Sequence, residues 1–241
     1  DLLKGDCLEL MKTIESGSID AIITDPPYGT TACKWDSVID FDLMWEQLNR
    51  IIKPNGAIVL FGSEPFSSFL RCSNIKNFKY DWIWKKNAGS NFAQVKYQPM
   101  KEHEVISVFS LNKHNYYPIK QERAEAGKKM VEAKIKSKPK LGTVYGNANS
   151  EGYDTSRADK NLRVPSSVQF FNRQRGLHPT QKPLALMEYL IKTYTNENET
   201  VLDFTMGSGS TGVAAKNLNR NFIGIEQDEN YFNIAKERIN E

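Results

Sequence analysis

The sequence predicts an α/β fold built on a mostly parallel, doubly wound sheet. Apolar segments of strand length alternate along the chain with amphipathic segments of helical length, which is the order typical of parallel sheets. A glycine-rich turn follows one of the later apolar segments and leads into an expected helix. We find no internal repeat, so the alternation describes one fold rather than an array of small units.

The expected strands are apolar runs that end at turn-forming residues. They cover residues 19–24, 57–63, 80–86, 103–110, 200–205 and 221–226. Pro26 and Pro27 stop the first of them, because proline has no backbone N–H to donate. The expected helices show apolar residues near helical spacing. They cover residues 7–14, 40–52, 64–78, 183–195 and 230–240, and a further helix follows the glycine turn within residues 207–218.

Composition is that of a soluble globular protein. Of the 241 residues, 39% are hydrophobic and 25% are charged. No apolar run approaches the roughly 18 residues that a membrane helix needs, and the first ten residues lack the pattern of a signal peptide. Three well-separated cysteines, Cys7, Cys33 and Cys72, predict neither a disulfide framework nor a zinc site. Reduced thiols favour a cytoplasmic protein.

Positive charge gathers in the middle of the chain. Residues 110–175 contain 14 Lys and Arg against 6 Asp and Glu, although the whole chain carries only +3. A basic segment within an otherwise acidic chain indicates a polyanionic partner. The alternative is an ordinary solvated helix face in "QERAEAGKKMVEAKIKSKPK".

The glycine turn has the pattern of a nucleotide-binding loop. Gly207, Gly209 and Gly212 fit G-x-G-x-x-G between an expected strand and an expected helix. Glycines let a backbone approach a ligand closely, and a helix N-terminus offers free N–H groups. Glu226 ends the next expected strand, where an acid can accept hydrogen bonds from ribose hydroxyls. The pattern suits NAD, FAD or S-adenosylmethionine (AdoMet), and a tight turn with a surface Glu is the structural alternative.

The motif "DPPYG" at residues 25–29 distinguishes between these cofactors. Together with "VLDFTMGSGSTGVAA" it resembles the DNA amino-methyltransferases, which modify N6 of adenine or N4 of cytosine. "GDCLELM", "KPNGAIVLFGS", "YDWIWKKN" and "HPTQKPLALMEYLI" match further segments of that family. The catalytic motif comes first, a basic region follows and the cofactor motif comes last, which resembles the permuted β class. The resemblance covers most of the chain and implies a Rossmann-like AdoMet-dependent methyltransferase fold with an inserted target-recognition region.

The resemblance implies a set of cofactor-binding residues and requires no metal. Asp6, with the Cys7 backbone, is expected to bind the adenine, Glu226 the ribose and Lys182 the methionine carboxylate. The full expected set is Asp6, Cys7, Asp25, Lys182, Asp203, Gly207, Ser208, Gly209, Ser210, Thr211 and Glu226. Asp6 has a structural alternative as the cap of the helix that follows it. One departure is visible: Thr205 stands where the family often has an aromatic residue, and Ser210 replaces a threonine.

The expected catalytic residues are Asp25, Pro26, Pro27 and Tyr28. An exocyclic amine is a poor nucleophile because its lone pair is delocalised into the ring. Its N–H groups can donate to the Asp25 carboxylate and to the Pro26 carbonyl, which the Pro-Pro unit holds rigid. Tyr28 offers a face for the base, which must flip out of the duplex. Core packing is the alternative for Tyr28.

Three functions remain open from the residues alone. The first is a site-specific DNA N6-adenine methyltransferase, with the N4-cytosine enzyme as the nearest alternative, because Asp rather than Ser before P-P-Y leans toward adenine in this family. The second is a dinucleotide-dependent oxidoreductase, which leaves "DPPY" and the basic region unexplained. The third is a catalytically silent DNA-binding module, against which the intact "DPPY" motif counts.

The expected organisation is one catalytic domain, residues 1–109 and 177–241, that carries an inserted target-recognition region, residues 110–176. The expected partner is double-stranded DNA, and a homodimer is possible. Arginine favours guanine in the major groove and also binds phosphate. The candidate DNA-binding residues are Arg157, Arg163, Arg173 and Arg175.

Overall fold

The computed structural model describes residues 1–30, 36–136, 159–174, 176 and 181–241. Two compact units are present. The larger unit contains residues Asp1–Tyr117 and Ser167–Glu241, and the smaller unit contains Pro118–Ser166.

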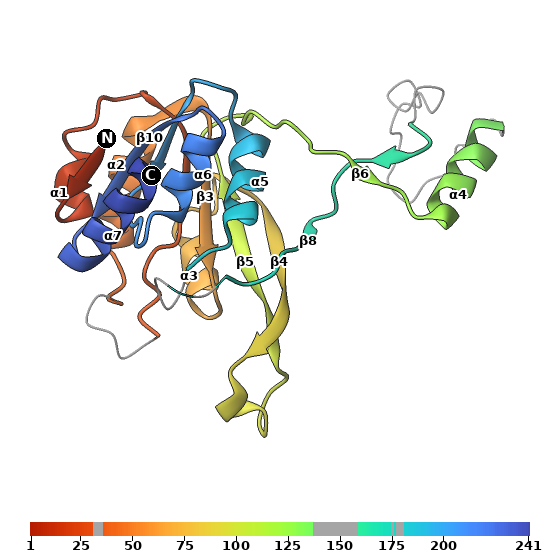
Figure 1. Cartoon of the computed structure of the whole chain (residues 1–241), viewed down its shortest axis with the longest axis horizontal. Helices are drawn as coiled ribbons and strands as arrows, with labels where there is room; N and C mark the ends of the chain where they lie inside the picture. The colour runs from red at the N-terminus through yellow and green to blue at the C-terminus, as the bar shows by residue number, and fades with distance from the viewer. Residues whose placement is uncertain (31–35, 137–158, 175, 177–180) are drawn as a thin grey trace. The chain divides into compact units, whose positions relative to one another are not determined.

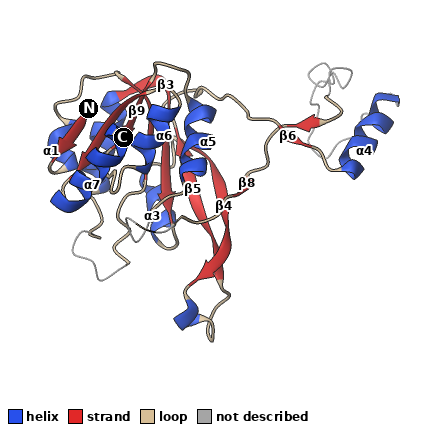
Figure 2. Ribbon diagram, viewed as in Figure 1, coloured by secondary structure: helices blue, strands red, loops and turns tan. Residues whose placement is uncertain are grey.

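An eight-stranded sheet forms the centre of the larger unit (Figures 1 and 2). Its order is β1-β10-β9-β2-β3-β5-β4-β8. All neighbours pair in parallel except β3 with β5 and β5 with β4. The strands are β1 (Leu2–Lys4), β2 (Ile19–Thr24), β3 (Ile52–Gly62), β4 (Phe78–Ser90), β5 (Lys101–Phe109), β8 (Val168–Phe170), β9 (Thr200–Asp203) and β10 (Asn221–Glu226).

Helices pack on both faces of this sheet, and the central strand β2 is buried on two sides. In β2, Ile22 packs with the cluster that contains Met44, Leu48 and Leu70, whereas Ala21 and Ile23 face the opposite cluster. Side chains of a strand alternate between faces, which explains why this apolar run has no polar side. The helices of the unit are α1 (Cys7–Met11), α2 (Phe41–Ile51), α3 (Phe66–Ser73), α5 (Leu184–Tyr194), α6 (Ser210–Asn217) and α7 (Glu229–Asn240), with the short η1 (Phe92–Gln94).

The predicted doubly wound, mostly parallel sheet is confirmed, with differences at the ends of strands. We expected the second strand to begin after "KPNG", but β3 begins at Ile52 and runs through Pro54. Its register against β2 shifts between the pairs Ile19↔Ile52 and Ala21↔Ala57. A bulge of this kind tolerates a proline, because the ladder hydrogen bond is already lost there. Strands β1 and β8 were not foreseen, since three residues are too few to show a periodicity.

The carboxyl ends of four neighbouring parallel strands meet at one edge of the sheet. Thr24 ends β2, Asp203 ends β9, Glu226 ends β10 and Lys4 ends β1. From β9 the chain continues outward through β10, whereas from β2 it continues the other way to β3. This is a topological switch point, where open α/β sheets place their ligands.

Two further features complete the fold. The hairpin of β4 and β5 extends beyond the rest of the sheet, and Phe92 and Tyr97 are exposed near its tip (Figure 1). The smaller unit contains a two-stranded sheet of β6 (Gln121–Glu122) and β7 (Leu162–Arg163), with helix α4 (Glu125–Lys136). Helix α4 lies within the basic middle of the chain, where the sequence left a solvated helix face open as the alternative to a segment that binds a polyanion. No helix among the described residues is long and apolar enough to cross a membrane.

Candidate functional site

A cavity of about 530 Å³ opens at the switch point. Its volume lies in the range that small-molecule sites occupy. Its wall comes from the carboxyl ends of four parallel strands and from the segment before α5. Of the residues predicted for catalysis and cofactor binding, all but one line it: Asp6, Cys7, Asp25, Pro26, Pro27, Tyr28, Lys182, Asp203, Gly207, Ser208, Ser210, Thr211 and Glu226.

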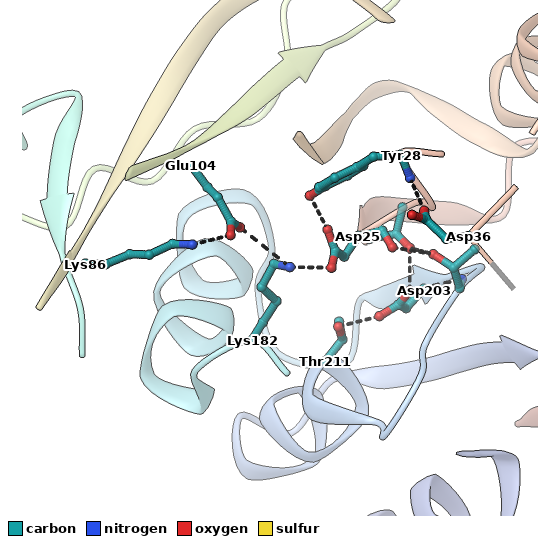
Figure 3. A network of polar contacts seen from close by, with 10 residues as sticks. Asp25, Tyr28, Asp36, Lys86, Glu104, Lys182, Asp203 and Thr211 are labelled. Atoms are coloured by element: carbon teal, nitrogen blue, oxygen red, sulfur yellow. Dashed lines mark hydrogen bonds and ion pairs between the residues drawn. The ribbon is translucent and has the colours of Figure 1, made fainter. Parts of the chain in front are cut away.

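The proline corner, residues Asp25–Tyr28, leaves β2 directly into this cavity. The Tyr28 hydroxyl donates a hydrogen bond to Asp25 Oδ1. Its ring packs 4.9 Å from the ring of Phe66, so Tyr28 both lines the cavity and contacts the core. The Asp36 carboxylate accepts hydrogen bonds from the backbone N–H groups of Tyr28, Gly29 and Thr30 at 2.8–2.9 Å. This carboxylate therefore fixes the path of the chain after the corner (Figure 3).

Asp25 is held through both of its carboxylate oxygens. Oδ1 accepts from Tyr28, and Oδ2 pairs with the buried Lys182 ammonium. Burial raises the pKa of Asp25, and the Lys182 charge opposes that rise. Lys182 also lies 3.6 Å from Glu104 Oε2. In this structure Lys182 thus contacts the proline corner and also lines the cavity, and its expected contact with a cofactor carboxylate stays a prediction.

Asp203 is buried at the end of β9 and accepts hydrogen bonds from three neighbours. The Thr24 and Thr211 hydroxyls and the Thr205 N–H donate to it. Burial raises its pKa to about 6, against the lowering effect of these hydrogen bonds. Thr205 also donates through its hydroxyl to the Asp25 carbonyl at 3.1 Å. The residue that departs from the family pattern therefore links Asp203 to the proline corner.

The glycine turn adopts left-handed backbone conformations. The Gly207 N–H donates to Glu226 Oε2 at 2.9 Å, which ties the turn to the end of β10. Gly209, with φ +78°, caps α6 but does not line the cavity. A Cβ there would lie 2.9 Å from Ala235 Cβ, so this glycine is required by the close approach of α7.

Asp6 and Cys7 lie at the other end of the cavity. Asp6 caps α1 by accepting from the N–H groups of Leu8 and Glu9, as its structural alternative predicted. It also lines the cavity, so capping and ligand contact are compatible. Burial raises the pKa of Cys7 to about 12, which keeps this thiol protonated and unreactive.

The candidate DNA-binding arginines are distributed over different parts of the chain. Arg163 is exposed at the end of β7 in the smaller unit. Arg173 belongs to the larger unit, where its backbone N–H donates a hydrogen bond to Asn87 Oδ1. Arg157 and Arg175 lie outside the described residues.

Sequence reasoning missed Glu104 and Lys86, although a signal for both exists. Glu104 shares a face of β5 with the buried Ile106 and Val108. Lys86 shares a face of β4 with the buried Trp82 and Trp84. A charge that continues the buried face of a strand indicates a buried partner of opposite sign. Asp36 and Thr24 carry no such signal, because their contacts depend on how distant segments meet.

The polar groups of the cavity suit a ligand with hydroxyls, a cationic group and a polar ring. Asp203 supplies a buried carboxylate and Glu226 a half-buried one, and the pKa values of both are raised mainly by burial. Among the described residues the buried Ser210 Oγ has no hydrogen-bond partner, so it is available to a ligand. The part of the chain that the structure describes contains no cluster of three or more His, Cys, Asp or Glu able to hold a metal ion.

Comparison with known proteins gives one family. A family model described as DNA methylase matches residues 19–237. The type II methyltransferase M.HpaI of Haemophilus parainfluenzae is 31% identical over 253 residues, which cover 99% of this chain and 73% of that protein.

Solved structures show the same fold. The M1.HpyAVI–SAM complex is 29% identical with a TM-score of 0.66, and the match covers 100% of this chain and 99% of the other. The cytosine-N4-specific PvuII DNA methyltransferase has a TM-score of 0.67 at 16% identity, with 99% and 85% coverage. At that identity the likeness concerns the fold alone.

Proposed function

This chain belongs to the DNA methylase family, and on that premise we propose that it transfers a methyl group from AdoMet to the exocyclic N6 of adenine in duplex DNA. One observation carries the proposal: the proline corner and the glycine turn open into the same cavity. A methyl donor and an amine acceptor must meet within about 3–3.5 Å for transfer, and a shared cavity allows this. Family membership also argues against the dinucleotide-dependent oxidoreductase.

AdoMet fits the residues that line the cavity. Glu226 can also accept from a ribose hydroxyl, since a carboxylate has about four lone-pair directions and backbone N–H groups, among them those of Gly207 and Asp228, occupy only part of them. Asp203 and Ser210 would bind the methionine portion, with the turn at Gly207, and Asp6 the adenine amine. When bound, AdoMet supplies a methyl group that its sulfonium charge already activates. The M1.HpyAVI–SAM complex supports the choice of this cofactor.

The proline corner would hold and activate the target amine. The Asp25 carboxylate has about four lone-pair directions, of which Tyr28 and Lys182 occupy two. Those that remain can accept an N–H of the amine, and the Pro26 carbonyl can accept the other. Pro26 and Pro27 fix the direction of that carbonyl because their rings lock φ. Fixed acceptors favour a tetrahedral nitrogen, whose lone pair can attack the methyl group.

Tyr28 would stack on the flipped base. A target amine inside the duplex cannot reach the cavity, so the nucleotide must leave the base stack. Stacking on an aromatic ring stabilises an unstacked base by about 1–3 kcal/mol. The Tyr28–Phe66 contact and the Tyr28–Asp25 hydrogen bond hold the ring in place before the base arrives.

Adenine is our choice over cytosine because Asp25 precedes Pro-Pro-Tyr, which leans toward adenine in this family. By analogy with the type II relatives, we assign the chain to a restriction–modification system acting in the cytoplasm. A homodimer stays a prediction.

Target recognition would reside in residues 110–176, which carry all of the excess positive charge, since the remaining residues are net negative. Phosphate contacts by Lys and Arg make affinity fall steeply with salt, because binding releases counterions. The exposed Arg163 is our first candidate in the described part of this region. DNA affinity that does not depend on salt would remove this role.

The test is methyl transfer from labelled AdoMet to mixed-sequence duplex DNA, followed by nucleoside analysis. We expect N6-methyladenine from the wild type and none from Asp25→Ala. N4-methylcytosine would keep the mechanism and reverse the choice of base. Unchanged N6-methyladenine from Asp25→Ala would contradict the role of the proline corner. Measurable AdoMet binding without any methylated nucleoside would contradict duplex DNA as the substrate.

A further inference from the structure

Four charged side chains of alternating sign lead from the sheet to the proline corner. Lys86 on β4 pairs with Glu104 Oε1 on β5. Glu104 Oε2 lies 3.6 Å from Lys182, and Lys182 pairs with Asp25 Oδ2. Figure 3 shows the four side chains in this order, with Lys182 between the two carboxylates. They come from four segments that are distant in sequence.

This chain of charges is largely withdrawn from water. The side chains of Lys86 and Lys182 are each 8% exposed, and those of Glu104 and Asp25 are 16% and 20% exposed. The Trp84 ring lies under the Lys86 ammonium and the Phe61 ring under the Lys182 ammonium. Buried ion pairs give little net stability, because desolvation offsets their attraction. A folded core alone therefore does not explain four buried charges at this position.

We propose that Glu104 is a positioning residue for methyl transfer, which shares Lys182 with Asp25 and thereby fixes the ammonium beside the catalytic carboxylate. This inference rests on the proposed function of Asp25. Lys182 has a flexible four-carbon stem, so one carboxylate alone would leave its ammonium several positions. A second carboxylate at a fixed place removes that freedom.

Glu104 is itself well fixed. It lies on β5, a strand with a neighbour on each side, opposite Trp84 of β4. Lys86 anchors its other oxygen. At the far end, Tyr28 fixes Oδ1 of Asp25 while Lys182 fixes Oδ2. Because both oxygens are oriented before substrate arrives, the remaining lone pairs point in set directions toward the cavity.

The charged neighbours of Asp25 have opposite effects on its ionisation. Lys182 favours the carboxylate, and Glu104 disfavours it. Tyr28 donates a hydrogen bond to Asp25 that favours its carboxylate form. The Asp203 carboxyl lies near Asp25, and the Asp25 charge raises the pKa of Asp203. Lys86 and Lys101 act on Glu104, whose pKa they lower together with Lys182. Single substitutions at the two nearest charges should therefore shift the titration of Asp25 in opposite directions.

The direct measurement is the pKa of Asp25 by NMR of 13C-labelled aspartate, with the signal assigned by Asp25→Asn. We expect a higher pKa in Lys182→Met and a lower one in Glu104→Gln, which keeps the shape of the side chain. Asp20→Asn is the matched control, because Asp20 on β2 is a buried carboxylate that, like Asp25, pairs with a lysine, in this case Lys53. It should leave the Asp25 pKa unchanged. Equal or same-direction shifts in the two variants would overturn the inference.

Kinetics then separate positioning from folding. We expect Glu104→Gln to lower kcat for DNA methylation by about tenfold to a hundredfold, with little change in KM for DNA, since small displacements at a reacting centre have effects of this size. The acid limb of its pH profile should move to lower pH, and that of Lys182→Met to higher pH. A Glu104→Gln enzyme with wild-type kcat would refute the positioning role. Opposite NMR shifts in a protein that methylates no DNA would uphold the charge arrangement and refute the proposed function instead.

Discussion

AdoMet affinity is expected to fall at acid pH because of Asp203. The buried carboxyl has a pKa of about 6, and only its ionised form attracts a cationic amino group. The perturbation is a change of pH across this value. Asp203 is 4% exposed, so bulk water screens its interactions little.

The magnitude follows from the pKa. A rise from 3.8 to about 6 corresponds to about 3 kcal/mol between the charged and neutral forms in the folded protein. Because the folded-state pKa is raised, the neutral Asp203 carboxyl contributes to the free energy of unfolding, and this contribution is fully present below pH 3.8 and is lost as the pH rises through about 6. A cation bound beside the ionised carboxylate offsets this loss of stability. If only ionised Asp203 binds AdoMet, Kd at pH 5 should be about tenfold weaker than at pH 7.5.

Isothermal titration calorimetry of AdoMet binding from pH 5 to pH 8 is the assay. Thr24→Val removes a hydrogen bond that lowers the Asp203 pKa, so the midpoint should move to higher pH. Thr193→Val is the control, since Thr193 is equally buried and donates only to the Tyr189 carbonyl of its own helix. A Kd that stays constant over this range, or a midpoint unmoved by Thr24→Val, would refute the reasoning.

Three further predictions concern other parts of the molecule. Asp36→Ala should lower kcat by about tenfold to a hundredfold with AdoMet Kd unchanged, because the chain after the proline corner loses three hydrogen bonds; equal kcat values would contradict this. Gly209→Ala should lower the free energy of unfolding by about 1–3 kcal/mol more than Gly17→Ala, since both have positive φ but only Gly209 meets Ala235, at 2.9 Å; denaturant titration measures the difference. Arg163→Ala should reduce the slope of log K against log salt by about one if Arg163 binds phosphate, and an unchanged slope excludes that contact.

The elements that the sequence predicted well are those with a strong local signal. The apolar run at residues 19–24 and the helix within 183–195 correspond closely to β2 and α5, because periodicity and flanking prolines are local properties. The proline corner and the glycine turn were expected at strand ends, and parallel pairing brings those ends to one edge. The cavity therefore follows from local patterns combined with one topological rule.

What the sequence did not predict depends on contacts between distant segments. Glu104 meets Lys182 across 78 positions of the chain only because β5 and the segment before α5 reach the same edge. Asp36 turns back to the proline corner from a loop without periodicity. For Lys182 the pairing with Asp25 was not predicted, and the cofactor contact that the family resemblance implies stays a prediction. Such a pairing depends on side-chain geometry, which spacing along the chain does not encode.

The central claim is that Asp25 acts on the target amine, even though it also belongs to the expected cofactor-binding set, whose other members suffice to hold AdoMet. Single-turnover methyl transfer to duplex DNA by Asp25→Asn, measured together with its AdoMet Kd, tests this most directly. The account predicts an AdoMet Kd within about threefold of the wild type and a transfer rate lower by at least about a hundredfold. Transfer at the wild-type rate, or a rate loss explained wholly by weaker AdoMet binding, would contradict it.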